Sequence, residues 1–219
     1  MLISDCMTRH PILVPPTMLA TEAQQILSEN HIRHLPVVES GKRLAGLVTR
    51  QQLLLKADAV GSLNVWEISR YLADVKVSNV MIKARDVVTI TAERTIERAS
   101  QIMAERKIGC LPVVEAENIV VGIVTETDLL RAFQEMLGLP SEGVRVTVRM
   151  ANRPGEFARL IAVLAEHHFG VMGVGTFPTR RMPGFYDAVL KIPNVTVDEV
   201  RTVLGAIPDQ EVVDVRSAV

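Results

Sequence analysis

A short segment of this chain pairs a hydroxyl with a carboxylate three residues later. Residues 122–128 read Gly-Ile-Val-Thr-Glu-Thr-Asp, an apolar stretch that ends at Thr125 and is followed by Asp128. Threonine is a good residue with which to begin a helix, and the free N–H groups of a helix start favour an anion. The Thr125 hydroxyl can donate to an anionic oxygen, and the Asp128 carboxylate can accept from hydroxyl groups. The alternative is that Thr125 is only a helix cap and Asp128 only a first-turn acid.

The sequence around this segment is repeated within the chain. His-Leu-Pro-Val-Val at 34–38 recurs 76 positions later as Cys-Leu-Pro-Val-Val at 110–114, and Gly-Leu-Val-Thr at 46–49 recurs as Gly-Ile-Val-Thr at 122–125. A constant offset indicates a duplicated structural unit. Two such units are expected to pack against each other, and the space between them is a natural ligand cleft.

The two copies differ where the chemistry is expected. The first copy keeps Thr49 but continues as Arg-Gln-Gln, which places Gln52 at the position of Asp128. Glutamine is neutral, and charge-assisted hydrogen bonds are roughly twice as strong as neutral ones. We therefore predict one competent site, which contains Asp128, and a second site that is weak, altered or empty.

Each copy repeats the same predicted order of elements. A short apolar strand (11–14 or 87–90) leads to an amphipathic helix, and the Leu-Pro-Val-Val strand follows with its proline at the strand start. After a turn, a third strand (44–48 or 119–124) ends at a threonine that begins the next helix. Residues 57–78 link the copies, and Trp66, Ile68, Leu72 and Val75 predict a helix there.

After residues 139–143 the pattern changes, which predicts a domain boundary. Apolar residues alternate through 144–150, and a helix should follow with its apolar face formed by Phe157, Leu160, Ile161, Leu164 and His168. Strands at 169–177 and 185–192, a helix around 200–207 and a strand at 211–215 complete a βαββαβ order. This order predicts a ferredoxin-like domain with helices on one face of a sheet. The uncovered face and edges favour dimerisation.

Composition excludes several functional classes. The 219 residues carry a formal net charge of −1, which argues against a broad nucleic-acid interface, and no apolar run is long enough to span a membrane. The first residues have no basic and apolar leader, so a cytoplasmic location is expected. Cys6 and Cys110 are interpreted as free thiols. Neighbouring His167 and His168 cannot chelate one metal, and Cys6 with His10 gives only two ligands. We find no catalytic constellation and expect neither a metal site nor enzymatic activity.

The repeats resemble CBS domains, and the pair resembles a Bateman module over residues 1–137. The resemblance rests on the two Leu-Pro-Val-Val strands, the two strand ends of the form Gly-h-h-Thr (h, apolar), and Met7 and Met81 before each first strand. It implies an adenine-containing ligand: AMP, ADP, ATP, NAD or S-adenosylmethionine. By this resemblance Thr125 and Asp128 hold phosphate and ribose and Thr127 adds a contact. By the same resemblance the partner repeat supplies the adenine wall through Ile12, Ile32, Arg33 and His34, and Arg33 or His34 could also meet the phosphate charge.

The C-terminal region resembles an ACT domain. Asn-Arg-Pro-Gly at 152–155 stands where that family commonly has Asp-Arg-Pro-Gly. The resemblance implies either an amino-acid site at the loop that contains Asn152 and Gly155, or a structural dimer. The second strand reads Val171-Met172-Gly173, where ligand-binding members often have asparagine in the middle. Asn152 and Met172 therefore both weaken the binding alternative, and Met172 favours a dimer interface.

Together these features predict an α/β (α+β) chain: tandem CBS domains followed by a ferredoxin-like ACT domain. The expected parts are CBS repeat 1 (1–56), a helical linker (57–78), CBS repeat 2 (79–137), a short linker (138–143) and the ACT-like domain (144–219). This layout resembles the acetoin-utilisation accessory proteins. We expect a homodimeric regulatory protein that senses an adenine nucleotide. The alternative is an assembly module that scaffolds a partner enzyme, with its nucleotide constitutive or absent.

Overall fold

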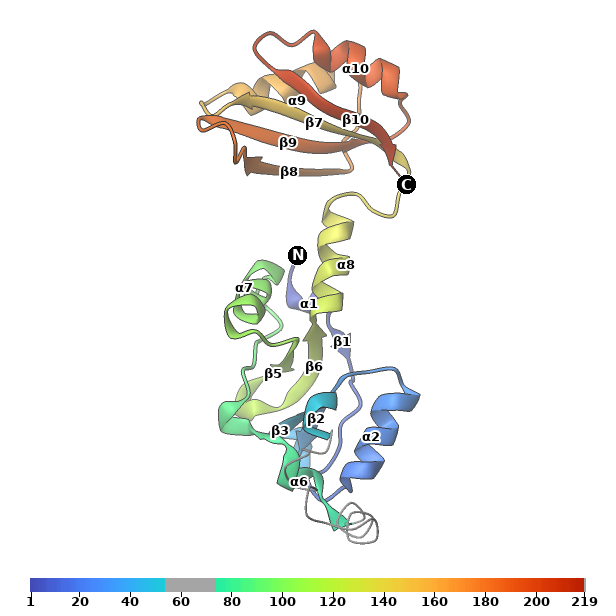
Figure 1. Cartoon of the computed structure of the whole chain (residues 1–219), viewed down its shortest axis with the longest axis vertical. Helices are drawn as coiled ribbons and strands as arrows, with labels where there is room; N and C mark the ends of the chain where they lie inside the picture. Colours follow the sequence, from blue (N-terminus) through green and yellow to red (C-terminus); the bar gives the residue numbers. More distant parts are fainter. Residues whose placement is uncertain (54–73, 219) are drawn as a thin grey trace. The chain divides into compact units, whose positions relative to one another are not determined.

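The computed structural model describes residues 1–53 and 74–218. The chain divides into two compact units, Met1–Leu129 and Leu130–Val219 (Figure 1). The helix predicted around Trp66, Ile68 and Leu72 lies outside the described residues. Helix α6 occupies Val77–Val80, so it begins at the end of the predicted linker and continues into the second copy.

The first unit confirms the duplication. Strands β2 and β5 are the two Leu-Pro-Val-Val segments, and β3 and β6 end at Thr49 and Thr125, as predicted. The helices and strands of the first copy are α1 (Ile3–Cys6), β1 (Thr8–Arg9), α2 (Ala20–Glu29), β2 (His34–Val38), β3 (Leu44–Thr49) and α3 (Arg50–Leu53). Those of the second are α6, β4 (Ile82–Lys83), α7 (Ile96–Arg106), β5 (Cys110–Val114), β6 (Val120–Thr125) and α8 (Glu126–Met136), and short 3-10 turns lie at Ser40–Lys42, Ala84–Asp86 and Ala116–Asn118.

The two copies exchange their first short strands. The three-stranded sheets have the orders β2-β3-β4 and β1-β6-β5, so β1 joins the sheet of the second copy and β4 joins that of the first. A side chain at Gly46 would collide with the carbonyl oxygen of Ile82, and one at Gly122 would lie 2.7 Å from the Met7 sulfur. The glycine of each strand end is therefore needed because an exchanged segment packs directly over it.

The predicted strands at 11–14 and 87–90 are shorter than expected. Only Val14 and Ile90 form bridges, parallel to Val37 and Val113. The prediction that proline starts its strand is also wrong, because Pro36 is the third residue of β2. It is tolerated because its carbonyl faces the Val14 segment, whose N–H it accepts at 3.1 Å, so its missing N–H costs no bond to β3.

The interface between the copies is apolar and pseudo-symmetric. Leu44 packs with Val114 and Val120 in one cluster, and a second cluster joins Leu47 to Cys110 and Ile123. An antiparallel bridge joins Arg43 to Ile119, and these two positions are equivalent in the 76-residue repeat. Since each residue contacts its own counterpart, the local twofold axis that relates the copies passes between them.

The second unit has the predicted βαββαβ order. Its elements are β7 (Gly143–Ala151), α9 (Glu156–Glu166), β8 (Gly173–Pro178), β9 (Phe185–Ile192), α10 (Val197–Gly205) and β10 (Glu211–Ala218). They form one antiparallel sheet of order β10-β7-β9-β8, with both helices on the same face (Figure 1). The second strand begins at Gly173 instead of residue 169.

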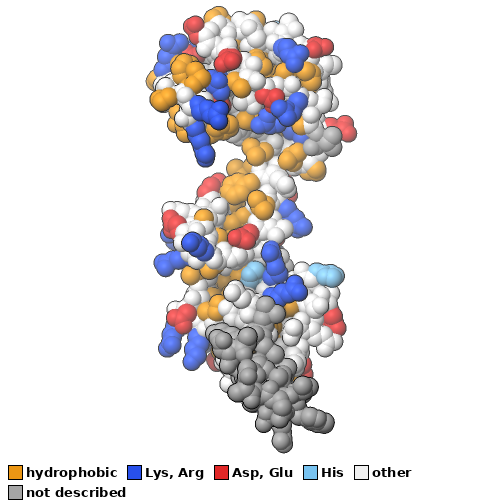
Figure 2. Space-filling view, viewed as in Figure 1, with side chains coloured by type: hydrophobic (Ala, Val, Ile, Leu, Met, Phe, Trp, Pro, Cys, Tyr) orange, Lys and Arg blue, Asp and Glu red, His pale blue; other side chains and the backbone are white. Residues whose placement is uncertain are grey.

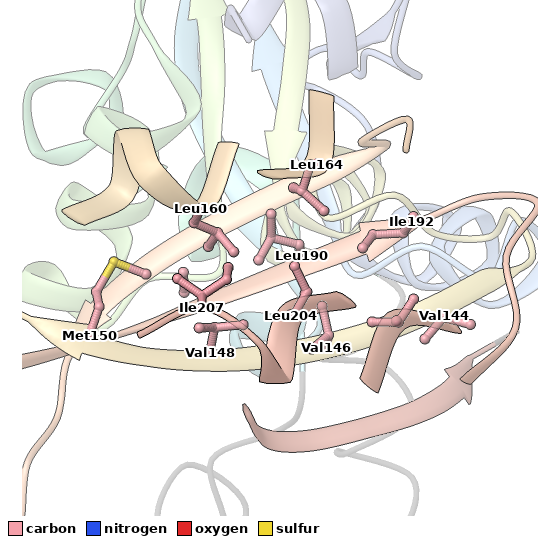
Figure 3. Close-up of a cluster of buried hydrophobic side chains, with 12 residues drawn as sticks. Val144, Val146, Val148, Met150, Leu160, Leu164, Leu190, Ile192, Leu204 and Ile207 are labelled. Atoms are coloured by element: carbon pink, nitrogen blue, oxygen red, sulfur yellow. The ribbon is translucent and has the colours of Figure 1, made fainter. Parts of the chain in front are cut away.

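The core of this unit lies between the sheet and the helices. Leu160 and Leu164 of α9 meet alternate residues of β7 and β9, as the labelled side chains in Figure 3 show. The apolar face predicted for helix α9 is partly wrong. Phe157 and Ile161 are exposed, and His168 lies beyond the helix end, exposed and with a positive φ of 56°. The helix ends before His168, so helical periodicity no longer places that side chain.

Candidate functional site

A cleft of about 430 Å³ lies between the two CBS-like copies. The first copy contributes the start of β2, the end of β3 and the first turn of α3, while the second contributes the segments at 86–88 and 107–110. Its principal lining residues are Arg33, His34, Thr49, Arg50, Gln52, Asp86, Val88, Lys107 and Ile108. Both copies therefore supply walls, as expected for a cleft between duplicated units. It is the cleft of the first-copy motif, which contains Gln52.

The first-copy motif is held by a local cap. The backbone N–H of Thr49 donates to Gln52 Oε1 at 3.0 Å, and the Thr49 hydroxyl donates to the same oxygen. The amide oxygen of Gln52 is therefore already engaged in capping the start of α3. Its amide NH₂ group is the part left to contact a ligand, and an NH₂ group donates to anionic oxygens.

The second-copy motif uses the same cap with a carboxylate. Asp128 Oδ2 accepts the Thr125 N–H at 2.8 Å and the Thr125 hydroxyl at 2.7 Å, and the Asp128 N–H points back to the Thr125 hydroxyl at 3.4 Å. The cap interpretation is thus confirmed for both residues. Asp128 Oδ1 has no hydrogen-bond partner among the described residues and keeps its acceptor capacity. The Thr125 hydroxyl proton is already engaged, and the N–H groups of Thr125, Glu126 and Asp128 also have acceptors, so the Thr127 N–H is the donor left without a partner among the described residues at this helix start.

His34 and Arg33 lie where the copies meet. His34 pairs with Thr49 across the β2–β3 ladder, and the Arg33 carbonyl accepts the Arg50 N–H at 3.1 Å. A side chain at Gly109 of the second copy would lie 3.5 Å from the His34 ring. Burial, and secondly the nearby Arg33 charge, lower the pKa of His34 below its ordinary value, which favours the neutral imidazole near pH 7.

Other predicted residues do not line this cleft. Ile12 and Thr127 are exposed, and Ile32 lines a separate hollow of about 450 Å³ beside the end of α2. The 76-residue offset relates Ile12 to Val88 and Ile32 to Ile108, both of which do line the cleft. The grouping of Ile12 and Ile32 with Thr125 and Asp128 in a second, symmetry-related cleft remains a prediction.

The charges of the two motifs differ. The Gln52 cleft has three cations in its lining, Arg33, Arg50 and Lys107, against one carboxylate, Asp86. Figure 2 shows lysine and arginine side chains beside histidine on the visible face of this unit. At the positions equivalent to Arg50 and Gln52, the second copy has Glu126 and Asp128. The first motif therefore favours anionic groups, whereas the second offers carboxylate acceptors.

Sequence reasoning missed the basic residues Arg50 and Lys107 and the apolar wall formed by Val88 and Ile108. The signal was present, because adding the repeat offset to the expected wall residues Ile12 and Ile32 yields Val88 and Ile108. The replacement of Asp128 by Gln52 predicts a site that is weak, altered or empty, without saying which of the three holds. The tertiary structure shows a formed cleft whose charge has changed.

The thiol of Cys110 is buried at the centre of the interface between the copies. Burial, and secondly the nearby Glu126 carboxylate, raise the pKa of Cys110 to about 12. The thiol is therefore protonated near neutral pH, and a protonated thiol is a poor nucleophile and metal ligand. The described residues contain no group of three or more His, Cys, Asp or Glu able to hold a metal ion. They also contain no helix long and apolar enough to cross a membrane.

The predicted loop site of the C-terminal unit is occupied by its own ion pairs. Gly155 begins α9 with a positive φ of 91° and lies open, and Asn152 is exposed. Arg153 Nε donates to buried Glu156 at 2.7 Å, and hydrogen bonds from Arg153 and then Gln210 lower the pKa of that carboxyl. The loop arginine is thus engaged in fixing the helix start. A ligand role for Asn152 and Gly155 stays a prediction.

Several known proteins are similar to the CBS-like region. Homoserine O-acetyltransferase of Methanohalobium evestigatum is 31% identical over 134 residues, which cover 61% of this chain but 24% of that enzyme. The first curated relatives therefore share this region as a quarter to a half of their length. Among solved structures, AcuB of Vibrio cholerae, described as a candidate acetoin utilization protein, is 30% identical, with a TM-score of 0.53 over 64% of this chain and 94% of that chain.

Two further solved structures are described as complexes with adenosyl ligands. The CBS domain pair of protein MJ0100, in complex with 5′-methylthioadenosine and S-adenosyl-L-methionine, is 26% identical with a TM-score of 0.50 over 61% of this chain and 95% of that chain. CBSX2, a protein of Arabidopsis thaliana, was solved in complex with AMP. It is 25% identical, with a TM-score of 0.51 over 60% of this chain and 95% of that chain. The CBS domain family model itself matches residues 3–58 and 77–135, more than half of the sequence. The chain belongs to the CBS domain family.

Proposed function

We propose that this protein is a regulatory sensor that binds an adenine-containing ligand between its CBS repeats. The observation that carries the proposal is the cleft at Gln52, whose walls come from both repeats. A ligand that contacts both walls binds one packing of the repeats better than any other, and this difference shifts the population of conformations. The adenosyl complexes of MJ0100 and CBSX2 support the ligand class.

The two motifs are proposed to select different parts of such a ligand. At the Asp128 motif, the free carboxylate oxygen can accept from ribose hydroxyls, with Thr125 and Thr127 near the helix start and Ile12, Ile32, Arg33 and His34 as the opposite wall. At the Gln52 motif, Arg50 and Lys107 favour phosphate groups by charge. The Gln52 site is therefore proposed to be altered rather than empty.

Calorimetry with AMP, ADP, ATP, NAD and S-adenosylmethionine tests the sensor function. We expect graded affinities among these ligands, with a change in small-angle scattering for those that bind. Asp128→Asn is the matched variant, because its amide oxygen can keep the cap while the charge is lost. If none of the five compounds binds, the sensor proposal is wrong. If all bind without any change in scattering, the protein is a nucleotide-containing scaffold instead.

For the C-terminal unit we propose an ACT domain that dimerises the protein. The edge strand β8 contains no charged residue, and Val174 and Phe177 on it are exposed, as is neighbouring Met172. An uncharged edge strand invites pairing with another strand. Val174→Lys is expected to give monomers in sedimentation, whereas Val213→Lys on the opposite edge strand, β10, is expected to leave the dimer intact. Monomeric wild-type protein would contradict this proposal.

A second candidate function is the regulation of a partner enzyme. It is favoured because relatives such as homoserine O-acetyltransferase carry the CBS region as part of an enzyme. In that case the protein would act on a partner enzyme supplied as a separate chain. Affinity capture from a host extract, repeated with and without the ligand identified by calorimetry, tests it. If the same enzyme is captured only with the ligand, or only without it, the protein both senses the ligand and acts on that enzyme. Capture of no enzyme would contradict the second function.

A further inference from the structure

The C-terminal unit contains a buried lysine that has no counter-charge among the described residues. Lys191 of β9 is 3% exposed, and its ammonium group has no hydrogen-bond partner among the described residues. Its strand neighbours Leu190 and Ile192 belong to the core beneath the helices. Because side chains alternate along a strand, Lys191 lies on the other face of the sheet.

The acidic groups of that face are already engaged. Asp187 accepts two bonds from Arg149, at 2.9 and 3.2 Å. Asp214 pairs with Arg216 at 2.6 Å and with Arg145 at 3.1 Å. Glu211 lies 3.5 Å from Arg149. A buried charge without a partner is costly, so an unpaired ammonium group here calls for a counter-ion from outside the described residues.

A cavity of about 300 Å³ lies beside this lysine. Lys191 and Arg145 are its charged lining residues among the described residues, which contribute no carboxylate to the lining. The remaining walls are apolar or glycine: Leu137, Leu139, Gly173, Gly175, Phe177, Val189, Leu190 and Ala218.

Glycines open the cavity on the β8 side and admit the segment that covers it. Gly173 and Gly175 are paired with Lys191 and Val189 across the β8–β9 ladder, so no side chain from β8 fills the space above those two residues. A side chain at Gly173 would collide with the backbone of Leu137. The lysine methylenes run close to Gly138, where an added side chain would lie 3.1 Å from Lys191 Cδ.

We propose that this cavity binds a small organic monoanion, a carboxylate on a short branched apolar chain. The carboxylate would pair with Lys191 and Arg145, and the chain would lie against Leu137, Val189 and Phe177. A free α-amino acid fits less well, since the described lining residues offer no carboxylate to receive its ammonium group and include two cations that would repel it. The site is separate from the loop at 152–155, which follows the opposite end of β7, and it does not depend on nucleotide binding.

Thermal unfolding of the full-length protein with 4-methylpentanoate tests the proposal, with 4-methylpentanamide as the uncharged control. We expect the acid to raise the unfolding midpoint with concentration, and the amide to have at most a small effect. Lys191→Met keeps the length of the side chain and removes its charge. This variant should unfold at a higher temperature than wild type without ligand, because an unpaired buried charge is gone, and should bind the acid at least about tenfold more weakly.

Two further variants separate binding from folding. Arg201→Met removes an exposed cation from α10, on the other face of the sheet, and should respond to the acid as wild type does. Gly175→Leu narrows the cavity without touching a charge and should also lose the response, which keeps the test valid if Lys191→Met fails to fold. Equal responses to acid and amide, an undiminished response in Lys191→Met or Gly175→Leu, or no response of the wild type at about 10 mM acid would overturn the proposal.

Discussion

Thr125 and Asp128 are joined by two hydrogen bonds to the same carboxylate oxygen, Oδ2, at 2.8 and 2.7 Å. The residues that could hold a ligand are therefore also the residues that begin helix α8. Thr49 and Gln52 are joined in the same way at the start of α3. The cap explains why both copies keep a threonine followed by an acceptor, and the ligand chemistry is left to the atoms that the cap does not use.

The first prediction separates these two roles at Asp128. Asp128→Asn should leave thermal stability nearly unchanged, because an amide oxygen can replace Oδ2 in the cap. It should weaken binding of AMP about tenfold, because the charged acceptor for ribose is lost. Asp128→Ala should weaken binding equally and also lose about 1 kcal/mol of stability with the cap. Calorimetry and denaturant unfolding measure the two effects, and an Asn variant with wild-type AMP affinity would remove Asp128 from the site.

The second prediction concerns the positive charge of the Gln52 cleft. In an Asp128→Asn background, which suppresses the other cleft, Arg50→Gln should weaken ATP binding about threefold, the scale expected for an exposed charge pair. Adenosine binding should not change, and the difference should shrink at high salt. Arg98→Gln on α7 is the matched control. Equal losses for ATP and adenosine would mean that Arg50 supports the fold of the cleft instead of contacting phosphate.

The third prediction is a pH dependence that comes from His34. The pKa of His34 is held below its ordinary value of 6.5, so between these two values the unfolded chain binds the proton that the folded chain does not. Stability should therefore fall as pH drops below about 6.5 and reach its full loss once pH passes the lowered folded value. His34→Gln should flatten this slope in unfolding measurements, whereas His10→Gln at an exposed position should keep it. An equal or steeper slope in His34→Gln would show that His34 is not the source of the pH dependence.

The fourth prediction concerns the strand exchange. Gly46→Ala should destabilise the protein by about 1–3 kcal/mol, because the new methyl group collides with the backbone carbonyl of Ile82. Gly122→Ala should cost less, since the nearest obstacle is the flexible Met7 side chain, and the double variant with Met7→Ala should recover part of the loss. Gly205→Ala, where an added methyl meets nothing within 4 Å, is the control and should be neutral or slightly stabilising. Denaturant unfolding midpoints measure these stability changes. Equal effects at Gly46 and Gly205 would show that the exchanged segment does not crowd Gly46.

Much of the fold could be read from local patterns. The 76-residue offset predicted the duplicated strands, alternation of apolar residues predicted β7, and the strand predicted at 185–192 has the bounds of β9. These signals are local because strand pairing and helix faces leave periodicities of two and 3.6 residues in the chain. Local patterns were less informative at element ends. The helix that begins at Glu156 stops before His168, and the Val14 and Ile90 strands are reduced to single bridges.

The sequence by itself determined that this chain is a duplicated unit followed by a βαββαβ unit, and that Thr125 and Asp128 begin a helix. Only the tertiary structure decided that β1 and β4 change places, that Arg50 and Lys107 share a cleft with Gln52, and that Lys191 is buried without a counter-charge. The reason is physical. Caps and periodicities arise from neighbours in the chain, whereas clefts, burial and unpaired charges depend on which distant segments the packed strands bring together.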